Sequence, residues 1–292
     1  MNNAKYSICG IVVAFLLAGC VTHSAGNRSA SVRGCLGTYS AAPRLGDHVD
    51  NQRLISELLD IHANTYHWVI HRTTNDWEDL QHFLPEARKK KIKVWVTLVP
   101  PSESPPRTSM YSEPFRLDYE RWGIEFAKLS LREPNLVAWS IDDFSWNVKF
   151  FTPAKMENIL TEARKINPRL AFVPCCYYRA ITPEFAKNYG PLVDGILFPY
   201  RDESGGANLK NPAHVQSEIE KLRQIFGPSM PIILDIYASP HSRLGATTPE
   251  YVEEAVRSGL KNGDGVLIYC HQDKTANAQK YEIIKRLFAT AR

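Results

Sequence analysis

The sequence predicts a single (β/α)8 TIM barrel, an α/β fold in which eight parallel strands alternate with eight helices. From residue 34 onward, short apolar runs alternate eight times with stretches of helical spacing. The eight units fill roughly 255 residues, a typical size for this fold. Connections after the strands are longer and more polar than those after the helices. A doubly wound sheet is the competing fold, but it would normally carry a glycine-rich phosphate loop after the first strand, and the sequence has none.

The predicted strands are apolar, β-branched runs bounded by turn residues. They are Cys35–Tyr39, Tyr66–His71, Lys93–Val99, a run from Leu136 up to Asp142, Leu170–Tyr178, Gly195–Tyr200, Met230–Tyr237 and Gly265–His271. The predicted helices are Asn51–His62, Asn75–Lys91, Leu117–Arg132, one opening at Thr152, one opening at Thr182, Asn211–Gly227, Thr248–Gly263 and Ala276–Ala291. Thr152, Thr182 and Thr248 each precede a proline, which predicts an N-cap followed by proline at the first helical position.

The first 20 residues read as an export signal. Lys5 supplies a positive charge, and Ile8–Leu17 is an apolar run too short to span a bilayer. The ending Leu17-Ala-Gly-Cys20 resembles the lipobox of bacterial lipoproteins, which implies that Cys20 becomes the lipidated N-terminus. An ordinary secretory signal is the alternative. The resemblance implies a domain outside the cytoplasm, anchored to a membrane of the bacterial cell envelope. Residues 21–33 then form a flexible tether, and residues 34–292 form the barrel.

The net charge and the positions of cysteine and histidine bear on whether the protein binds nucleic acid, forms disulfides or holds a metal. The net charge is only +4, and the one dense basic cluster, Arg88–Lys91, falls at a predicted helix end, so nucleic acid is not an expected partner. Beyond Cys20, the four remaining cysteines lie in apolar contexts without C-x-x-C spacing, which favours buried free thiols and leaves a disulfide open. Neither the His67 and His71 pair nor the His271 and Asp273 pair reaches three ligands, so no metal or cofactor is predicted.

Two adjacent carboxylates, Asp142 and Asp143, end the fourth predicted strand, framed by Trp139, Phe144 and Trp146. In parallel α/β folds the carboxyl ends of the strands carry the chemistry. Capping of a loop is the structural alternative. Strand alternation places Ala138, Ser140 and Asp142 toward the barrel interior, and Val137, Trp139 and Ile141 toward the helices. Asp143 can turn into the cleft where the strand breaks.

The other strand ends add aromatic and polar side chains to the same predicted rim. Aromatic faces against sugar rings, with polar groups for hydroxyls, suit carbohydrate recognition. The candidate substrate-binding residues are Tyr39, His71, Arg72, Trp146, Tyr177, Tyr178, Tyr200, Arg201, Asp202, Tyr237, Tyr269, His271 and Asp273. Asp235 interrupts an apolar strand, where a carboxylate is costly unless it is hydrogen-bonded or reaches solvent. A catalytic role and a structural tie between strands are both open for Asp235.

The segment Trp139–Phe144 resembles barrel glycoside hydrolases with an acidic pair after the fourth strand, and most closely the O-GlcNAcase and bacterial β-N-acetylglucosaminidase group. That resemblance implies that the substrate's acetamido oxygen is the nucleophile. Asp142 would orient and polarise the acetamido group and stay ionised, Asp143 would protonate the leaving oxygen, and Tyr177 or Tyr178 would assist. Without an acetamido group, Asp235 would be the nucleophile or base.

The expected function is hydrolysis of envelope or extracellular carbohydrate. A non-catalytic carbohydrate-binding lipoprotein and a structural envelope lipoprotein are the alternatives.

Overall fold

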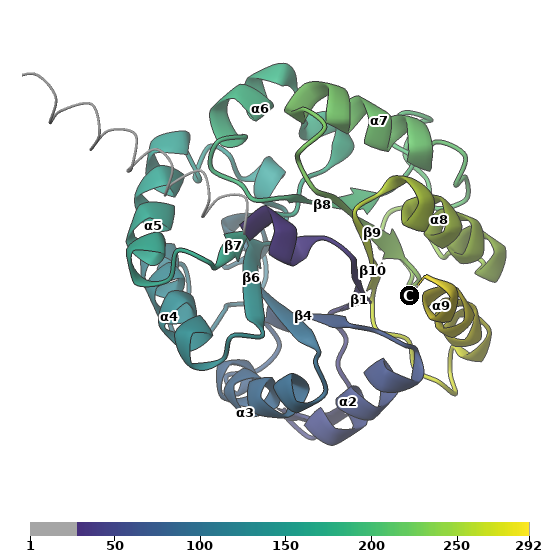
Figure 1. Ribbon diagram of the computed structural model, residues 1–292, viewed down its shortest axis with the longest axis horizontal. Coiled ribbons are helices and arrows are strands. Elements are labelled where there is room, and N and C mark those ends of the chain that lie inside the picture. Colours follow the sequence, from purple (N-terminus) through teal and green to yellow (C-terminus); the bar gives the residue numbers. More distant parts are fainter. Residues whose placement is uncertain (1–27, 292) are drawn as a thin grey trace, which may run out of the picture.

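The computed structural model describes residues 28–291, in which eight strands form one parallel sheet that curls around a common centre (Figure 1). The strand order is β7-β6-β5-β4-β1-β10-β9-β8. These strands are β1 (Cys35–Tyr39), β4 (Thr65–Ile70), β5 (Lys93–Leu98), β6 (Leu136–Ile141), β7 (Ala171–Phe172), β8 (Ile196–Tyr200), β9 (Ile232–Tyr237) and β10 (Gly265–Tyr269). The α/β class and the predicted strand sequence are confirmed. A short hairpin that the pattern did not predict, β2 (Arg44–Leu45) with β3 (His48–Val49), follows β1.

The helices surround the sheet on its outer side (Figure 1). They are α2 (Asn51–Asp60), α3 (Asp76–Lys89), α4 (Tyr119–Arg132), α5 (Pro153–Ile166), α6 (Pro183–Tyr189), α7 (Val215–Phe226), α8 (Pro249–Asn262) and α9 (Ala278–Thr290). The three predicted threonine N-caps are confirmed, since each side chain accepts a hydrogen bond from a backbone N–H of the first helical turn.

The predicted fifth strand, Leu170–Tyr178, is shorter than expected. β7 ends at Phe172, and Pro174, which has no backbone N–H, follows it. Beyond Pro174 the chain still contacts both neighbours, because Cys175 N–H donates to the Ile141 carbonyl at 3.2 Å and Cys176 N–H to the Leu197 carbonyl at 2.9 Å. A single parallel bridge between Cys175 and Leu197 therefore joins the two end strands of the sheet.

The sheet separates two apolar clusters. The larger lies between strands and helices and includes Trp139 and Ile141, and the smaller lies inside the ring of strands and includes Ala138. These three residues face as predicted. Val137 does not, because it packs against the inner cluster. The register between β5 and β6 shifts at this point, where Val94 pairs with Leu136 and Trp95 pairs with Ala138, so Val137 is an extra residue that interrupts the alternation.

The N-terminal part of the described chain is packed rather than free. Residues 28–32 are helical, and this segment lies within the ring of strands in Figure 1. Val32 is fully buried in the inner cluster, and the Arg28 guanidinium donates to Asp194 at 2.8 Å. These contacts involve the amino ends of the strands, opposite the acidic pair. Residues 28–33, which the composition assigns to a flexible tether, thus contact the sheet in this structure.

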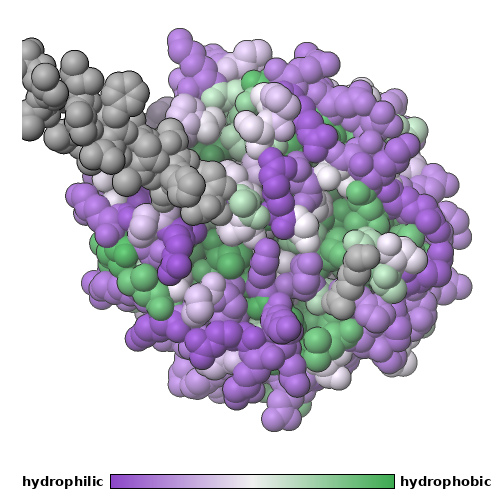
Figure 2. Space-filling view, in the orientation of Figure 1, coloured by the Kyte–Doolittle hydropathy of each residue, from purple (hydrophilic) through white to green (hydrophobic). Residues whose placement is uncertain are grey.

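The export signal, Cys20 and the first part of the predicted tether lie outside the described residues. Within residues 28–291, no helix has the length and apolar composition needed to cross a membrane. The face shown in Figure 2 is mainly hydrophilic, with apolar residues in small separate patches. The four cysteines of the described chain are free; Cys35, Cys175 and Cys176 are buried, and Cys270 is half-buried.

Candidate active site

A cavity of about 790 Å³ opens at the carboxyl ends of the strands. Its floor is acidic and its walls are aromatic and basic. The residues that define its chemistry are Tyr39, Glu103, Arg107, Asp142, Asp143, Trp146, Cys175, Tyr177, Arg201, Asp235, Tyr237, His241, Arg243 and Tyr269. The loops after β5, β6 and β9 supply most of the charged members.

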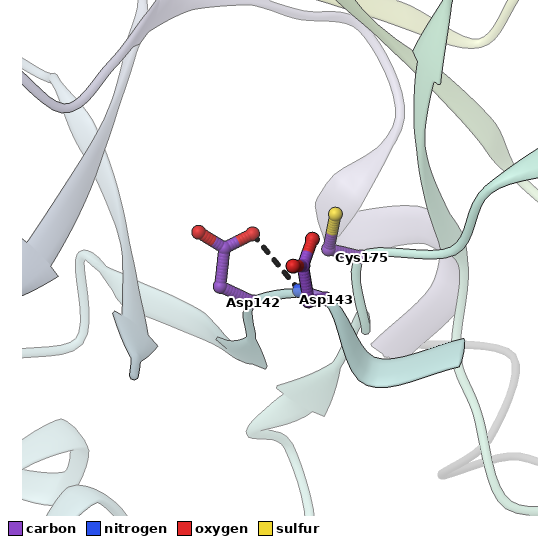
Figure 3. Close-up of side chains that lie close together, drawn as sticks. All are labelled: Asp142, Asp143 and Cys175. Carbon is purple, nitrogen blue, oxygen red and sulfur yellow. Dashed lines mark hydrogen bonds between the residues drawn. The ribbon is translucent and has the colours of Figure 1, made fainter. Parts of the chain in front are cut away.

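Asp142 and Asp143 occupy different positions although they are adjacent. Asp142 continues β6, and its backbone N–H still donates to the Leu98 carbonyl at 3.0 Å. Asp143 adopts a left-handed conformation with φ of 45°, uncommon for a residue with a side chain. The chain thus turns at Asp143, whose N–H donates to Asp142 Oδ1 at 3.0 Å (Figure 3). Both carboxyls are consequently held at the cavity floor.

Neighbouring loops fix the orientation of Asp143. The Tyr177 hydroxyl donates to Asp143 Oδ1 at 2.5 Å, and the Asn147 side chain donates to the Asp143 carbonyl at 2.9 Å. Tyr177 is itself held by its backbone N–H, which donates to Ser145 Oγ at 3.0 Å. Trp146 is 57% exposed, and its ring centroid lies 5.8 Å from that of Tyr177. The two rings form an aromatic shelf beside the acidic pair.

Burial raises the pKa of both carboxyls. Burial and then the charge of Asp143 raise the pKa of Asp142 to about 6. Burial also raises the pKa of Asp143, but the Tyr177 hydrogen bond and the charge of Arg201 act in the opposite direction. The charged form is therefore better supported on Asp143 than on Asp142. This arrangement runs against the predicted roles, in which Asp143 held the proton and Asp142 the charge.

Glu103 is a third acidic group of the floor that sequence reasoning missed. It ends the 3₁₀ helix η1 (Pro101–Glu103) after β5, and burial followed by the charges of Asp142 and Asp143 raises its pKa to about 8. Asn147 ties this segment to the acidic pair, accepting from Ser102 N–H at 3.1 Å and donating to Ser102 Oγ at 2.8 Å. The signal was present, because Glu103 lies directly beyond a predicted strand end in a proline-rich loop.

Asp235 lies on β9 with its side chain directed to the inside of the sheet. The residue is 1% exposed, and its Oδ1 atom has no hydrogen-bond partner within residues 28–291. Burial and the charge of Asp142 raise its pKa well above the ordinary range. The structure gives no support to a tie between strands through Oδ1. Asp235 instead lies at the cavity, in electrostatic contact with Asp142.

The structure gathers about half of the predicted rim into this cavity. Residues on inward-facing positions of the strands, or in the segments that follow β6, β7 and β8, reach it. They are Tyr39, Asp142, Asp143, Trp146, Tyr177, Arg201, Asp235, Tyr237 and Tyr269. Cys175 joins them from the bridge to β8.

Three of the other predicted residues lie outside the cavity and contact neighbouring elements instead. Tyr178 contacts Phe198, and Tyr200 is fully buried and donates to the Asn211 carbonyl at 2.7 Å. His271 braces α2, since its ring nitrogens contact Thr38 at 3.0 Å and Glu57 at 2.8 Å. These side chains therefore contact other parts of the protein and do not line the cavity.

The remaining predicted residues act in loops. Asp202 is buried and contacts His214 Nδ1 at 2.6 Å, which fixes the loop after β8. Asp273 accepts from Thr275 and Ala276 N–H groups before α9. His71 and Arg72 leave the ring because their N–H groups donate to Asp76 Oδ2, at 2.9 and 2.6 Å, where α3 begins; they line a separate 200 Å³ cavity.

Asp142, Asp143 and Cys175 could together hold a metal ion. One ligand atom from each lies within 4.8 Å of the others, and Figure 3 shows the three side chains side by side. Burial raises the pKa of the Cys175 thiol well above its ordinary value, so metal binding would first have to deprotonate it. The prediction that the protein uses no metal remains a prediction.

The curled parallel sheet with its helical cover resembles the folds of several solved glycoside hydrolases. The structure is similar to a GH2 β-galacturonidase from Eisenbergiella tayi, with a TM-score of 0.58, 12% identity, and coverage of 88% of this chain and 51% of that one. It is also similar to a glucosidase from Croceicoccus marinus, with a TM-score of 0.61, 11% identity, and coverage of 89% and 66%.

A third similar structure is an endoglucanase from Pseudomonas stutzeri, with a TM-score of 0.58, 9% identity, and coverage of 87% of this chain and 94% of that one. No protein-family model and no curated protein matches the sequence. The chain thus spans about half of the galacturonidase and nearly all of the endoglucanase. At these identities the likeness establishes the fold.

Proposed function

We propose that the protein is a glycoside hydrolase whose catalytic groups are Asp142, Asp143 and Glu103. The observation that carries the proposal is the set of three interacting carboxyl groups at the floor of a cavity walled by aromatic rings. Glycosidic cleavage needs a proton donor for the leaving oxygen and a carboxylate that supports the anomeric carbon. Repulsion within this set keeps one group protonated while another stays charged near neutral pH.

The electrostatics divide these roles among the three groups. Glu103, with its pKa raised to about 8, is protonated at neutral pH and is the proposed proton donor. Asp143 is oriented by Tyr177 and supports positive charge at the anomeric carbon. The charge of Asp142 adds to burial in raising the pKa values of Glu103 and Asp235.

The resemblance to the O-GlcNAcase group adds a finer proposal. A substrate with an acetamido group would use its own oxygen as nucleophile, and the acidic pair would orient that group. Of the two tyrosines considered from the sequence, only Tyr177 lines the cavity. The comparison of an N-acetylglucosaminide with the matching glucoside tests this point, because acetamido participation requires a large preference for the former.

Two further proposals concern the whole chain. The parallel bridge between Cys175 and Leu197 supports closure of the sheet into a full (β/α)8 barrel. The lipobox-like ending at Cys20 supports an envelope lipoprotein, anchored to a bacterial membrane with its domain outside the cytoplasm. Incorporation of labelled fatty acid should occur in the native chain and disappear in Cys20→Ala; labelling that persists in this variant would exclude the anchor.

A panel of nitrophenyl glycosides and polysaccharides tests the activity directly. We expect turnover of at least one substrate, and losses on the order of 10²–10⁴-fold in Asp142→Asn and Asp143→Asn. The control is Asp273→Asn, a carboxyl that lies outside the cavity. Full activity in both cavity variants would remove the acidic pair from the mechanism.

A non-catalytic carbohydrate-binding lipoprotein is the second candidate, favoured by the exposed Trp146 and its contact with Tyr177. Such a shelf can bind a sugar ring without any reaction. Under this alternative, Trp146→Ala would abolish glycan binding by a protein that turns over none of the panel. Turnover that depends on the acidic pair would exclude it.

A further inference from the structure

The wall of the cavity beside Asp143 is basic, although its floor is acidic. Arg201 comes from the loop after β8, and His241 and Arg243 come from the loop after β9. The charge of Arg201 and that of Arg243 both lower the pKa values of Asp143 and His241, behind the larger effect of burial on each. These mutual effects place the three basic side chains in one corner, which we call the basic corner.

The His241 side chain is held as a hydrogen-bond donor. Residues 241–245 form a tight turn, closed by hydrogen bonds of 2.9 and 3.0 Å between the backbones of His241 and Gly245. Within the turn, Nδ1 of His241 accepts from the N–H groups of Arg243 at 3.0 Å and Leu244 at 3.2 Å. A ring nitrogen that accepts carries no proton, so the neutral ring bears its hydrogen on Nε2.

Arg201 is rigid and keeps donors available. Its Nε and Nη2 atoms donate to Glu203 Oε1, and its guanidinium lies 3.9 Å above the centre of the Tyr177 ring. Glu203 is fixed in turn, since it accepts from Arg179 N–H at 2.7 Å. The Nη1 atom has no acceptor among the described side chains. A stacked, braced guanidinium of this kind loses little conformational entropy when it binds an anion.

Arg243 is the exposed member of the basic corner. Among residues 28–291, no carboxylate forms an ion pair with Arg243. Arg243 lines the same cavity as Arg201 and His241. A neutral sugar bound against the basic corner would leave these charged donors without an anionic acceptor, which costs binding free energy. An anionic sugar would supply the acceptor and bind more favourably.

We propose that the basic corner binds an anionic substituent of the substrate, a carboxylate or a sulfate ester carried by the sugar ring, with Arg201 and Arg243 as its ligands and His241 as a further donor. This inference rests on the proposed function and names the substrate class of the same cavity. Planar guanidinium groups match the paired oxygens of such substituents, whereas a neutral hydroxymethyl group offers them no charge.

Matched nitrophenyl substrates test the proposal: the β-glucuronide against the β-glucoside, the galacturonide against the galactoside, and a 6-sulfated glucoside against its parent. We expect kcat/KM to favour the anionic member by roughly 10- to 100-fold. The carboxylate and sulfate arms show which anion is preferred. Arg243→Gln should remove most of the preference through KM for the anionic member, and Arg243→Lys should give an intermediate value. Arg121→Gln, on the outer side of α4, is the control.

Binding separates this inference from the proposed function. Calorimetry with methyl β-glucuronide and methyl β-glucoside reports the charge preference even if no glycoside is hydrolysed. Tighter binding of the glucuronide, weakened by salt and by Arg243→Gln, supports the basic corner whether or not turnover occurs. Equal binding of the two ligands would overturn the inference. So would hydrolysis confined to neutral glycosides at a rate that Arg243→Gln does not change. Neither outcome would contradict hydrolase activity itself.

Discussion

At the residue scale, the cavity floor joins acidic groups whose pKa values are raised to different extents. Above about pH 6 Asp142 becomes charged, and below about pH 8 Glu103 keeps its proton. A mechanism that needs a charged pair and a protonated Glu103 is therefore active in the window between these two values. We expect kcat/KM to rise with pH near 6 and to fall near 8.

The variant Glu103→Gln should lose the fall in kcat/KM near pH 8, because glutamine has no proton to release. Its rate should drop on the order of 10²–10⁴-fold with a poor leaving group and much less with a nitrophenyl group, which needs little protonation. Glu113→Gln is the matched control, since Glu113 lies in the same proline-rich segment but pairs with Arg116. A pH profile for Glu103→Gln with both limbs intact would contradict the assignment.

The raised pKa of Asp235 has a consequence for stability. The folded protein holds this proton to a higher pH than the unfolded chain, whose aspartates have pKa values of about 3.9. The free energy of unfolding therefore falls as pH rises from about 4 through the folded-state pKa. Asp235→Asn should escape this loss, so its melting temperature relative to the native protein should rise with pH.

Asp273 provides a control, because its effect on stability should depend on pH in the opposite direction. Its N–H contacts with Ala276 and Thr275, and then Arg53, lower its pKa. Its stabilising effect is present above the unfolded pKa and is lost as pH falls. Asp273→Asn should thus be slightly less stable than the native protein at neutral pH and equal to it in acid. Parallel trends for the two variants would refute the account of Asp235.

At the element scale, the turn of residues 241–245 depends on glycine. Gly245 has φ of 80°, a conformation that side chains disfavour, although a methyl group added to its Cα would meet no described atom within 4 Å. Gly245→Ala should therefore cost about 1 kcal/mol through backbone strain alone. If strain opens the turn, His241 and Arg243 separate, and KM for the preferred glycoside should rise.

Thermal unfolding and steady-state kinetics of Gly245→Ala test this turn, with Ser242→Ala as the control from the same segment. Ser242 lines the cavity mouth without a side-chain hydrogen bond within the described range. An unchanged KM in Gly245→Ala would show that the turn does not need its closed backbone to present the basic residues.

Element order was predictable from the sequence because the alternation of apolar runs, caps and prolines is local. The face on which each strand-end residue points was less predictable. Tyr177 and Tyr178 are equally aromatic, yet only Tyr177 reaches the cavity. The β-bulge at Val137 depends on pairing with β5, and the outward turn of His71 depends on Asp76. Both features depend on contacts with other segments, which a local sequence pattern does not predict.

Residues beyond the strand ends were the hardest to predict. Glu103, His241 and Arg243 lie in long loops that contain other charged and polar residues, so their types alone do not distinguish them from solvent-exposed neighbours. Their place in the cavity comes from the η1 segment, the Ser102–Asn147 contacts and the turn at Gly245. By contrast, Asp142 and Asp143 were identifiable because an apolar strand leads directly into them.

At the scale of the whole molecule, the sheet is covered at the amino ends of its strands by residues 28–33, while its carboxyl ends remain open as the cavity. Arg28 reaches Asp194 at 2.8 Å and the Pro168 carbonyl at 3.0 Å, and Lys93 donates to the Ser31 carbonyl at 2.9 Å. The segment therefore joins β5 to the connections before β7 and β8. We expect these contacts to stabilise the end of the sheet opposite the cavity.

The fully buried Val32 gives the sharpest test of this segment. Val32→Ala removes two methyl-sized groups from the inner cluster and leaves a cavity, which should lower the free energy of unfolding by about 2 kcal/mol. In a domain of this size, that loss corresponds to a fall in melting temperature of roughly 4–8 °C. Activity at a permissive temperature should stay unchanged, because Val32 lies opposite the acidic pair. Leu45→Ala is the control, since Leu45 is 70% exposed. If Val32→Ala and Leu45→Ala have the same melting temperature, residues 28–33 behave in solution as the tether that the sequence composition predicted.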